Sequence, residues 1–170
     1  MPAARRSNCA NEVIDLSAFG DAVQSSPLGV WAGGEIYPIA NLVHLLGLVM
    51  LVGGIGILDL RLIGMFRRIP TEALAAALTP IAIAGLLFMI PSGATMFASD
   101  ASTLVNSWTF QTKLMLIGLA LANAIAFRFI WQKRIGQWDV NPPIWGRVMA
   151  AVSILLWLSV AALGRWIAYS

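Results

Sequence analysis

The 170-residue chain is 59% hydrophobic but only 11% charged, and its mean hydropathy is +0.80. Soluble globular domains carry about 25% charged residues, and a fold of this size cannot hide so much apolar surface from water. Its net charge of +3 does not indicate nucleic-acid binding, because the lysines and arginines flank apolar segments. The composition predicts an integral membrane protein, and the lipid bilayer is therefore one of its predicted partners.

The N-terminal region divides into a tail and a short helix. Residues 1–14 hold the paired arginines and the single cysteine, Cys9, but no apolar run, and we expect a loose tail there. In residues 15–35, Leu16, Phe19 and Val23 share one helical face. This spacing predicts a short helix lying at the membrane interface.

Four apolar segments are long enough to cross a bilayer, which takes about 20 residues per helix. Only helices satisfy the backbone of such open-ended segments in lipid, so the fold class is all-α, a four-helix transmembrane bundle. Short connections make neighbouring spans antiparallel, and residues 15–170 form a single domain. The predicted spans are residues 37–58, 79–98, 108–131 and 144–168.

Lysine and arginine are distributed unevenly between the two sides of this topology. The side with the first and third connections carries seven cations, and the opposite side carries four. The excess of cations marks the cytoplasmic side, which predicts that both termini lie outside the cytoplasm. The seven are Arg61, Arg67, Arg68, Arg128, Lys133, Arg134 and Arg147; the four are Arg5, Arg6, Lys113 and Arg165.

A first group of polar residues lies inside the spans, toward the non-cytoplasmic side. Ionisable groups in a membrane span usually face the bundle interior, and this depth is shared by His44, the only histidine, and by Lys113 and Arg165. Met89 and Met96 lie on the same face of the second span. We expect these five residues to form a ligand-binding site between the helices.

Three interpretations of His44 are open. It packs by hydrogen bonding to a neighbouring helix, it ligates haem b or copper with Met89 or Met96 nearby, or it binds a proton or small molecule. The neighbouring glycines Gly47 and Gly54 allow another helix to approach closely, and they equally make room for a flat haem. A two-histidine haem requires a homodimer that supplies His44 twice. The cations Lys113 and Arg165 favour an anion such as a carboxylate.

A second polar group lies at the cytoplasmic ends of the spans. We expect Asp59 to form a structural ion pair with Arg61 or Arg147, which fixes the helix ends at the interface. Pro91 lies inside the second span and predicts a kink, the feature that would serve a small transporter subunit. The sequence has no zinc-protease pattern, phosphate loop or nucleophile elbow, so it gives no positive evidence for an enzyme.

Several segments resemble a family of small bacterial four-helix membrane proteins, a domain of unknown function. They are residues 25–64 (SSPLGVWAGGEIYPIANLVHLLGLVMLVGGIGILDLRLIG), residues 110–124 (FQTKLMLIGLALANA) and residues 163–169 (LGRWIAY). The resemblance implies a location in the bacterial inner membrane. The family's recurring positions coincide with His44, Asp59, Arg61, Lys113 and Arg165.

Span one and residues 110–124 are more distantly similar to copper-resistance membrane proteins and b-type transmembrane cytochromes, which implies copper or haem b held by His44. Taken together, the sequence predicts a non-enzymatic inner-membrane protein that binds a ligand or a protein partner through the polar group around His44. The alternatives are a haem- or copper-binding component of electron transfer or metal handling, and a small transporter subunit.

Overall fold

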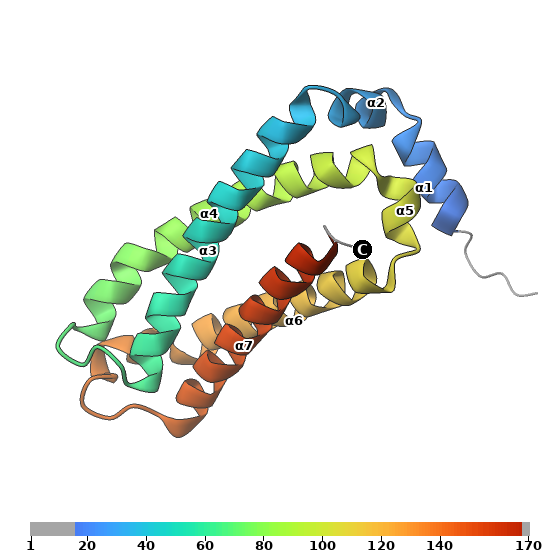
Figure 1. Cartoon of the computed structure of the whole chain (residues 1–170). Coiled ribbons are helices and arrows are strands. Elements are labelled where there is room, and N and C mark those ends of the chain that lie inside the picture. The colour runs from blue at the N-terminus through green and yellow to red at the C-terminus, as the bar shows by residue number, and fades with distance from the viewer. Residues whose placement is uncertain (1–15, 168–170) are drawn as a thin grey trace, which may run out of the picture.

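A computed structural model of the chain describes residues 16–167. Within that range the regular structure is helical and no strand occurs (Figure 1). Four of the helices are long and apolar enough to cross a membrane, which confirms the predicted fold class. The elements are α1 (Leu16–Gln24), α2 (Pro27–Gly33), α3 (Ile36–Ile63), α4 (Thr71–Ser99), α5 (Ala101–Val105), α6 (Trp108–Trp131), the 3₁₀ helix η1 (Gln132–Gln137) and α7 (Ile144–Ile167).

The four predicted spans correspond to α3, α4, α6 and α7. The third span matches α6 at both ends, and α7 begins at the predicted residue. The first two helices are longer than predicted. Helix α3 continues beyond residue 58 to Ile63, and α4 begins at Thr71 instead of residue 79. Helix α4 continues through Pro80 and Pro91. The tail predicted over residues 1–14 lies outside the described residues.

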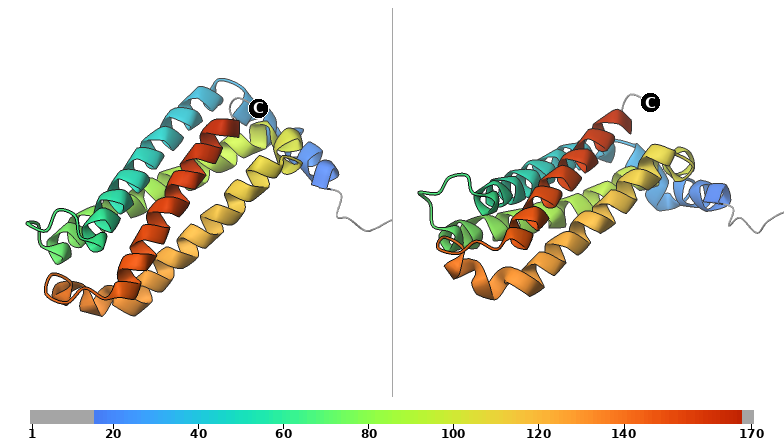
Figure 2. Two further views of the ribbon diagram at one scale, coloured as in Figure 1. Left: turned by 60° about the horizontal axis from the view of Figure 1, so that its bottom comes forward. Right: turned by 90° about the horizontal axis from the view of Figure 1, so that it is seen from below.

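The bundle consists of two helical hairpins, α3–α4 and α6–α7, joined along one seam. Helix α3 packs against both α4 and α7, and α6 packs against α7 (Figures 1 and 2). Over the described chain, no Cα atoms of α4 and α6 come within 8 Å of each other. The rings of Phe97, near the end of α4, and Phe110, at the start of α6, stack with their centroids 5.5 Å apart.

The two helices of the first hairpin cross with their backbones almost in contact. A Cβ atom on Gly47 would lie 2.7 Å from the carbonyl oxygen of Gly85, and a Cβ on Gly85 would lie 2.6 Å from that of Gly47. Only glycine permits this approach at either position. Two turns further along α3, a Cβ on Gly54 would lie 3.2 Å from the Cβ of Ala82. The space beside Gly47 and Gly54 is therefore filled by α4, not left open for a flat ligand.

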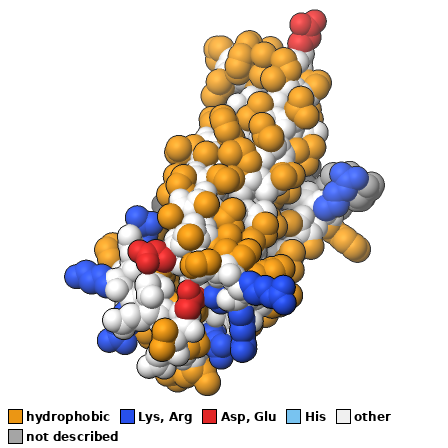
Figure 3. Space-filling view, turned by 90° about the vertical axis from the view of Figure 1, so that its left-hand side faces the viewer, with side chains coloured by type: hydrophobic (Ala, Val, Ile, Leu, Met, Phe, Trp, Pro, Cys, Tyr) orange, Lys and Arg blue, Asp and Glu red, His pale blue; other side chains and the backbone are white. Residues whose placement is uncertain are grey.

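The connections gather at two ends of the bundle, which differ in charge. The basic end holds residues 64–70 and 132–143, and Lys and Arg side chains surround it while hydrophobic side chains cover the body of the bundle (Figure 3). The terminal end holds α1, α2 and α5, the starts of α3 and α6, and the end of α7 (Figure 1).

Two short helices, rather than the single one predicted, precede the first span. Ser26 caps α2 by accepting from the amide of Gly29, and Pro27 begins the new helix, which separates α2 from α1. Helix α1 is docked on α5, because the side-chain oxygen of Gln24 accepts hydrogen bonds from the amide and hydroxyl of Ser102 at 3.0 and 2.6 Å. The outward sides remain apolar, as an interfacial position requires; their exposed residues are Leu16, Phe19, Leu28, Val30 and Trp31.

Candidate functional site

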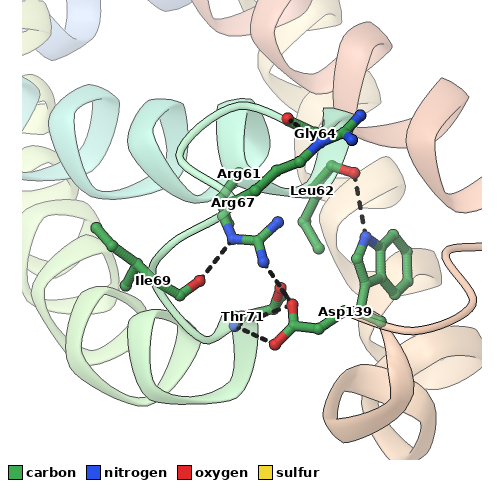
Figure 4. A network of polar contacts seen from close by, with 8 residues as sticks. Arg61, Leu62, Gly64, Arg67, Ile69, Thr71 and Asp139 are labelled. Carbon is green, nitrogen blue, oxygen red and sulfur yellow. Dashed lines mark hydrogen bonds and ion pairs between the residues drawn. The ribbon is translucent and has the colours of Figure 1, made fainter.

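At the basic end, Arg61 is the centre of a polar network that joins three segments of the chain (Figure 4). Its side chain is 5% exposed, and its Nη2 lies 2.5 Å from a carboxylate oxygen of Asp139. Its Nε donates to the carbonyl of Ile69 at 2.7 Å. The same carboxylate accepts from the hydroxyl of Thr71 and from the Thr71 amide at 3.2 and 3.3 Å. Asp139 thus caps the start of α4 from a distant loop.

Next to this network, Trp138 inserts into the bundle from the loop between α6 and α7. Its side chain is 2% exposed, and its indole N–H donates to the carbonyl of Leu62 at 3.1 Å. Its ring lies 5.6 Å from that of Phe127 and 6.1 Å from that of Trp131. A buried indole with a satisfied N–H contributes both apolar area and a fixed orientation. The basic end is therefore closed by packing as well as by charge.

The network also changes the acidity of Asp139. The hydroxyl of Thr71 is the largest cause of a lowered pKa at this carboxyl, and the Thr71 amide and the charge of Arg61 act in the same direction against partial burial. All three interactions favour the ionised form. Asp139 consequently stays charged and bound to its donors throughout the neutral range.

The structure corrects the ion pair that the sequence predicts for Asp59. Within residues 16–167, Arg61 pairs with Asp139 rather than with Asp59, because residues two apart on a helix do not face each other. Arg147 extends toward Gly64, where its Nη2 lies 3.2 Å from the position of an added Cβ. Asp59 instead accepts a hydrogen bond from the hydroxyl of Ser153 on α7.

At the terminal end, His44 on α3 is bonded to Ser92 on α4. The His44 Nδ1 and the Ser92 Oγ are 3.0 Å apart, and the Ser92 hydroxyl donates to the carbonyl of Phe88 at 2.6 Å. A serine hydroxyl has only one proton, so its oxygen accepts from the imidazole and Nδ1 carries the hydrogen. This bond leaves the other ring nitrogen, Nε2, as the acceptor of the neutral imidazole. The ring lies against Gly93, where an added Cβ would be 3.2 Å away.

Lys113 on α6 completes this cluster from the second hairpin. It is close enough to His44 to interact with it electrostatically, and its Nζ lies 3.4 Å from where a Cβ on Gly164 of α7 would be. In the described part of the chain, no hydrogen-bond or ion-pair partner is found for the Lys113 ammonium group. Arg165 follows Gly164 in the last turn of α7, and its side chain is exposed.

The two methionines predicted for the site have different positions. Met89 packs against Gly47, where its Cγ lies 2.8 Å from the position of an added Cβ, and it borders the core cluster around Leu51. This is the packing role that methionine commonly has in helix contacts. Met96 is half-buried, and its carbonyl accepts from the hydroxyl of Ser99. No group of three or more His, Cys, Asp or Glu with the proximity of a metal site occurs in residues 16–167.

Sequence reasoning missed the two most connected residues of the basic end, Trp138 and Asp139. Both lie in the third connection, which was predicted only as a loop. A tryptophan next to an aspartate in a loop rich in Lys and Arg was a signal that could have indicated them. Asn123 of α6 also forms an interhelical bond, because its amide donates to the carbonyl of Met149 on α7 at 3.1 Å.

Comparison with known proteins identifies the chain through one family model, described as a family of unknown function (DUF6644), which matches residues 21–170. The chain belongs to the DUF6644 family. This family membership confirms the resemblance to a domain of unknown function, and the four spans make the family member a multi-pass membrane protein. Neither a curated protein nor a solved structure matches the chain. The distant similarity to copper-resistance proteins and b-type cytochromes stays a prediction.

Proposed function

We propose that this membrane protein binds a small anion, with a carboxylate as the best-matched class, at the terminal end between α3, α6 and α7. The observation that carries the proposal is the ammonium group of Lys113, which has no hydrogen-bond or ion-pair partner in the described chain and lies within electrostatic range of His44. An unpaired cation within a membrane span is costly. A bound anion would compensate that charge with a charge-assisted hydrogen bond.

The neighbouring groups fit such a ligand. His44 is oriented by Ser92, and the Lys113 ammonium group lies close to Gly164 of α7, where an added Cβ would be 3.4 Å from Nζ. Met89 packs against Gly47, one turn from His44 on α3, so we expect it to support the position of His44. The exposed cation Arg165 adds to the positive potential at this end of the bundle.

A thermal-stability measurement on the detergent-solubilised chain tests the proposal. Acetate, benzoate and phosphate are compared with chloride at constant ionic strength. A ligand at tenfold its Kd stabilises the folded state by about 1.4 kcal/mol, so the carboxylate that binds should raise Tm in the wild type. Lys113→Met should abolish this gain. Lys133→Met, which removes an exposed lysine at the basic end, should preserve it.

Two results contradict the proposal. One is a wild type that no anion stabilises more than chloride does. The other is an equal gain in Tm for the wild type and for Lys113→Met, which would place the anion elsewhere on the surface.

A haem b or copper ion at His44 is the second candidate, and the hydrogen bond to Ser92 favours it by leaving Nε2 as an acceptor. The close contact of α3 with α4 argues against a flat macrocycle beside Gly47. An absorption spectrum in both redox states, with metal analysis, decides the matter on the same purified sample. A Soret band or near-stoichiometric copper that His44→Ala removes would replace the anion as the ligand.

The same proposal places the basic end in the cytoplasm of a bacterial cell and both termini outside the inner membrane. The support is the excess of lysine and arginine around that end. In a Cys9→Ser background, a membrane-impermeant maleimide applied to cells should label Asn106→Cys at the terminal end. It should not label Val140→Cys, which is equally exposed at the basic end. The reverse pattern would invert the orientation. A homodimer or a membrane-protein partner stays a prediction.

A further inference from the structure

Asp59 is a buried carboxyl group with one of its oxygens unused. It lies in the transmembrane helix α3, its side chain faces α7, and it is 7% exposed. One hydrogen bond reaches it from the hydroxyl of Ser153, while its Oδ2 has no hydrogen-bond partner. An unsatisfied carboxylate oxygen in a low-dielectric environment is costly, so the arrangement calls for a hydrogen-bond donor at that atom.

A small cavity lies beside this carboxyl group, between α3 and α7. Its volume is about 40 Å³, and it is lined by apolar side chains apart from Asp59 and the indole of Trp157. The Trp157 Nε1 is likewise buried and without a partner. A site needs about 10–15 Å³ to hold a water molecule, so this cavity is large enough for water, although its surface is almost entirely apolar. From Asp59 the lining runs along α3 to Val52, about 10 Å toward the middle of the span.

The charges around the cavity leave Asp59 without a counter-ion. Arg61, on the same helix, is turned toward Asp139. On α7, the nearest charged residue is Arg147, six positions before Ser153, and it extends toward Gly64. Helix α4 contributes no titratable residue to the lining, and neither does α6. The C-terminal end of α3, one turn away, carries partial negative charge that disfavours a nearby anion.

We propose that Asp59 is a proton-binding site inside the membrane, reached through the cavity between α3 and α7. In its protonated form the carboxyl is neutral, and its O–H supplies the donor that Oδ2 otherwise lacks. Release of the proton leaves a carboxylate held by Ser153 and by water in the cavity. A metal cation suits the site less, because Mg²⁺ and Ca²⁺ take six or more oxygen ligands and the site offers only the carboxylate and the Ser153 hydroxyl.

The hydrophobic reagent dicyclohexylcarbodiimide tests the proposal on the full chain in detergent or liposomes. It adds across a protonated carboxyl group, whose proton moves to nitrogen as the new C–O bond forms, and the adduct rearranges to a stable N-acylurea without a leaving group. Intact mass and peptide mapping should show one adduct, at Asp59. Labelling should fall as pH rises, by up to about tenfold per pH unit, as expected for one proton.

Three variants provide the controls. Asp59→Asn should lose the adduct, whereas Glu72→Gln, which changes an exposed carboxyl at the basic end, should keep it. Gly56 lines the cavity and an added Cβ there meets nothing within 4 Å, so Gly56→Leu should fill the cavity and suppress labelling with Asp59 intact. Gly53→Leu makes the same change on the same helix at an equally open position outside the lining, and it should label like the wild type.

Because the central result comes from the wild type, a variant that fails to fold does not remove the test. The proposal is overturned if the folded wild type is not labelled at Asp59, or if labelling is independent of pH. It is also overturned if sodium, exchanged for choline at constant pH, abolishes labelling, since Asp59 would then bind a metal cation. Unchanged labelling in Gly56→Leu would rule out the cavity as the route.

Discussion

Two cations, Arg61 at the basic end and Lys113 at the terminal end, have opposite surroundings. At the basic end, the guanidinium of Arg61 is bonded to Asp139 and to the carbonyl of Ile69, and a buried tryptophan covers the network. At the terminal end, the ammonium of Lys113 has no hydrogen-bond or ion-pair partner in the described residues, and the imidazole of His44 is bonded to the neutral hydroxyl of Ser92. Removing one partner of a buried ion pair is strongly destabilising because it leaves the other charge uncompensated, whereas a cation without a partner in the described residues is available to a ligand.

The comparison assigns stability mainly to the basic end and binding mainly to the terminal end. Substitutions would contradict this assignment if their effects on the free energy of unfolding were not larger at the basic end than at the terminal end. Four substitutions, two at each end, probe it through the free energy of unfolding of the solubilised protein.

Trp138→Ala should be the most destabilising change. It removes a fully buried indole, its ring contacts with Phe127 and Trp131 and its bond to the carbonyl of Leu62. Loss of a large aromatic from a core costs about 3–5 kcal/mol. Trp145→Ala is the matched control, because Trp145 is 72% exposed and should cost far less. Equal losses in Tm for the two variants would show that Trp138 does not hold the basic end.

Asp139→Asn should cause the next largest loss of stability. The amide keeps the size of the side chain but removes the charge that pairs with the buried Arg61 and accepts from Thr71. Hydrogen bonds to charged groups contribute about 1.5–3 kcal/mol. Asp21→Asn changes an exposed aspartate at the terminal end and should leave chemical or thermal unfolding unchanged.

The same pair of proteins gives a prediction about pH. The Thr71 hydroxyl, followed by its amide and Arg61, lowers the pKa of Asp139 below its ordinary value of 3.8. A group with a lowered folded pKa stabilises the fold above its unfolded pKa and loses that contribution as pH falls through the folded pKa. The stability gap between wild type and Asp139→Asn should therefore be full at neutral pH and should close below about pH 4. A gap that is constant under acid would contradict this.

Gly47→Ala probes the terminal half of the bundle through its backbone contact. The added methyl group would lie 2.7 Å from the Gly85 carbonyl oxygen and 2.8 Å from Met89, so α3 and α4 must separate. Overpacking of this kind costs about 1–3 kcal/mol. Gly53→Ala is the control on the same helix, since nothing lies within 4 Å of its added Cβ. If Gly47→Ala is as stable as Gly53→Ala, the helices do not cross at Gly47 and Gly85.

Ser92→Ala should have the smallest effect. It removes the hydroxyl that holds Nδ1 of His44, and interhelical hydrogen bonds in membranes average about 0.6 kcal/mol. Ser159→Ala, at an exposed position of α7, should be neutral. The more informative readout is anion binding, which should weaken in Ser92→Ala because the imidazole loses its orientation. A loss of stability as large as that of Trp138→Ala would erase the distinction between the two ends.

The fold was predictable because the bilayer constrains it so strongly. Length and apolarity located all four spans, and the third was placed residue for residue. The glycine face of α3 was also predictable as a close helix contact, since Gly47 and Gly54 recur at helical spacing. The partner of that face was not predictable, because the spacing of glycines within one helix does not say whether a neighbouring helix or a ligand fills the space beside them.

The polar contacts were predicted less well, for reasons of geometry. Asp59 and Arg61 are close in sequence, yet a helix turns them to different faces, and each found its partner on another element. Asp139 and Trp138 come from a loop whose path depends on the tertiary structure, so no periodicity pointed to them. His44 and Lys113 lie within electrostatic range of each other, and their common role in one ligand site stays a prediction.

The loop that carries Trp138 and Asp139 also has a consequence for the order of events during biosynthesis. The amide of Thr71 and the carbonyl of Leu62 meet partners that lie 68 and 76 residues later in the chain. When the first hairpin leaves the ribosome, Arg61 therefore has no counter-ion and the cavity for the indole is empty. Asp139 supplies the counter-ion and Trp138 fills the cavity only as the last span is made. The final step of folding is therefore tied to the final stage of synthesis.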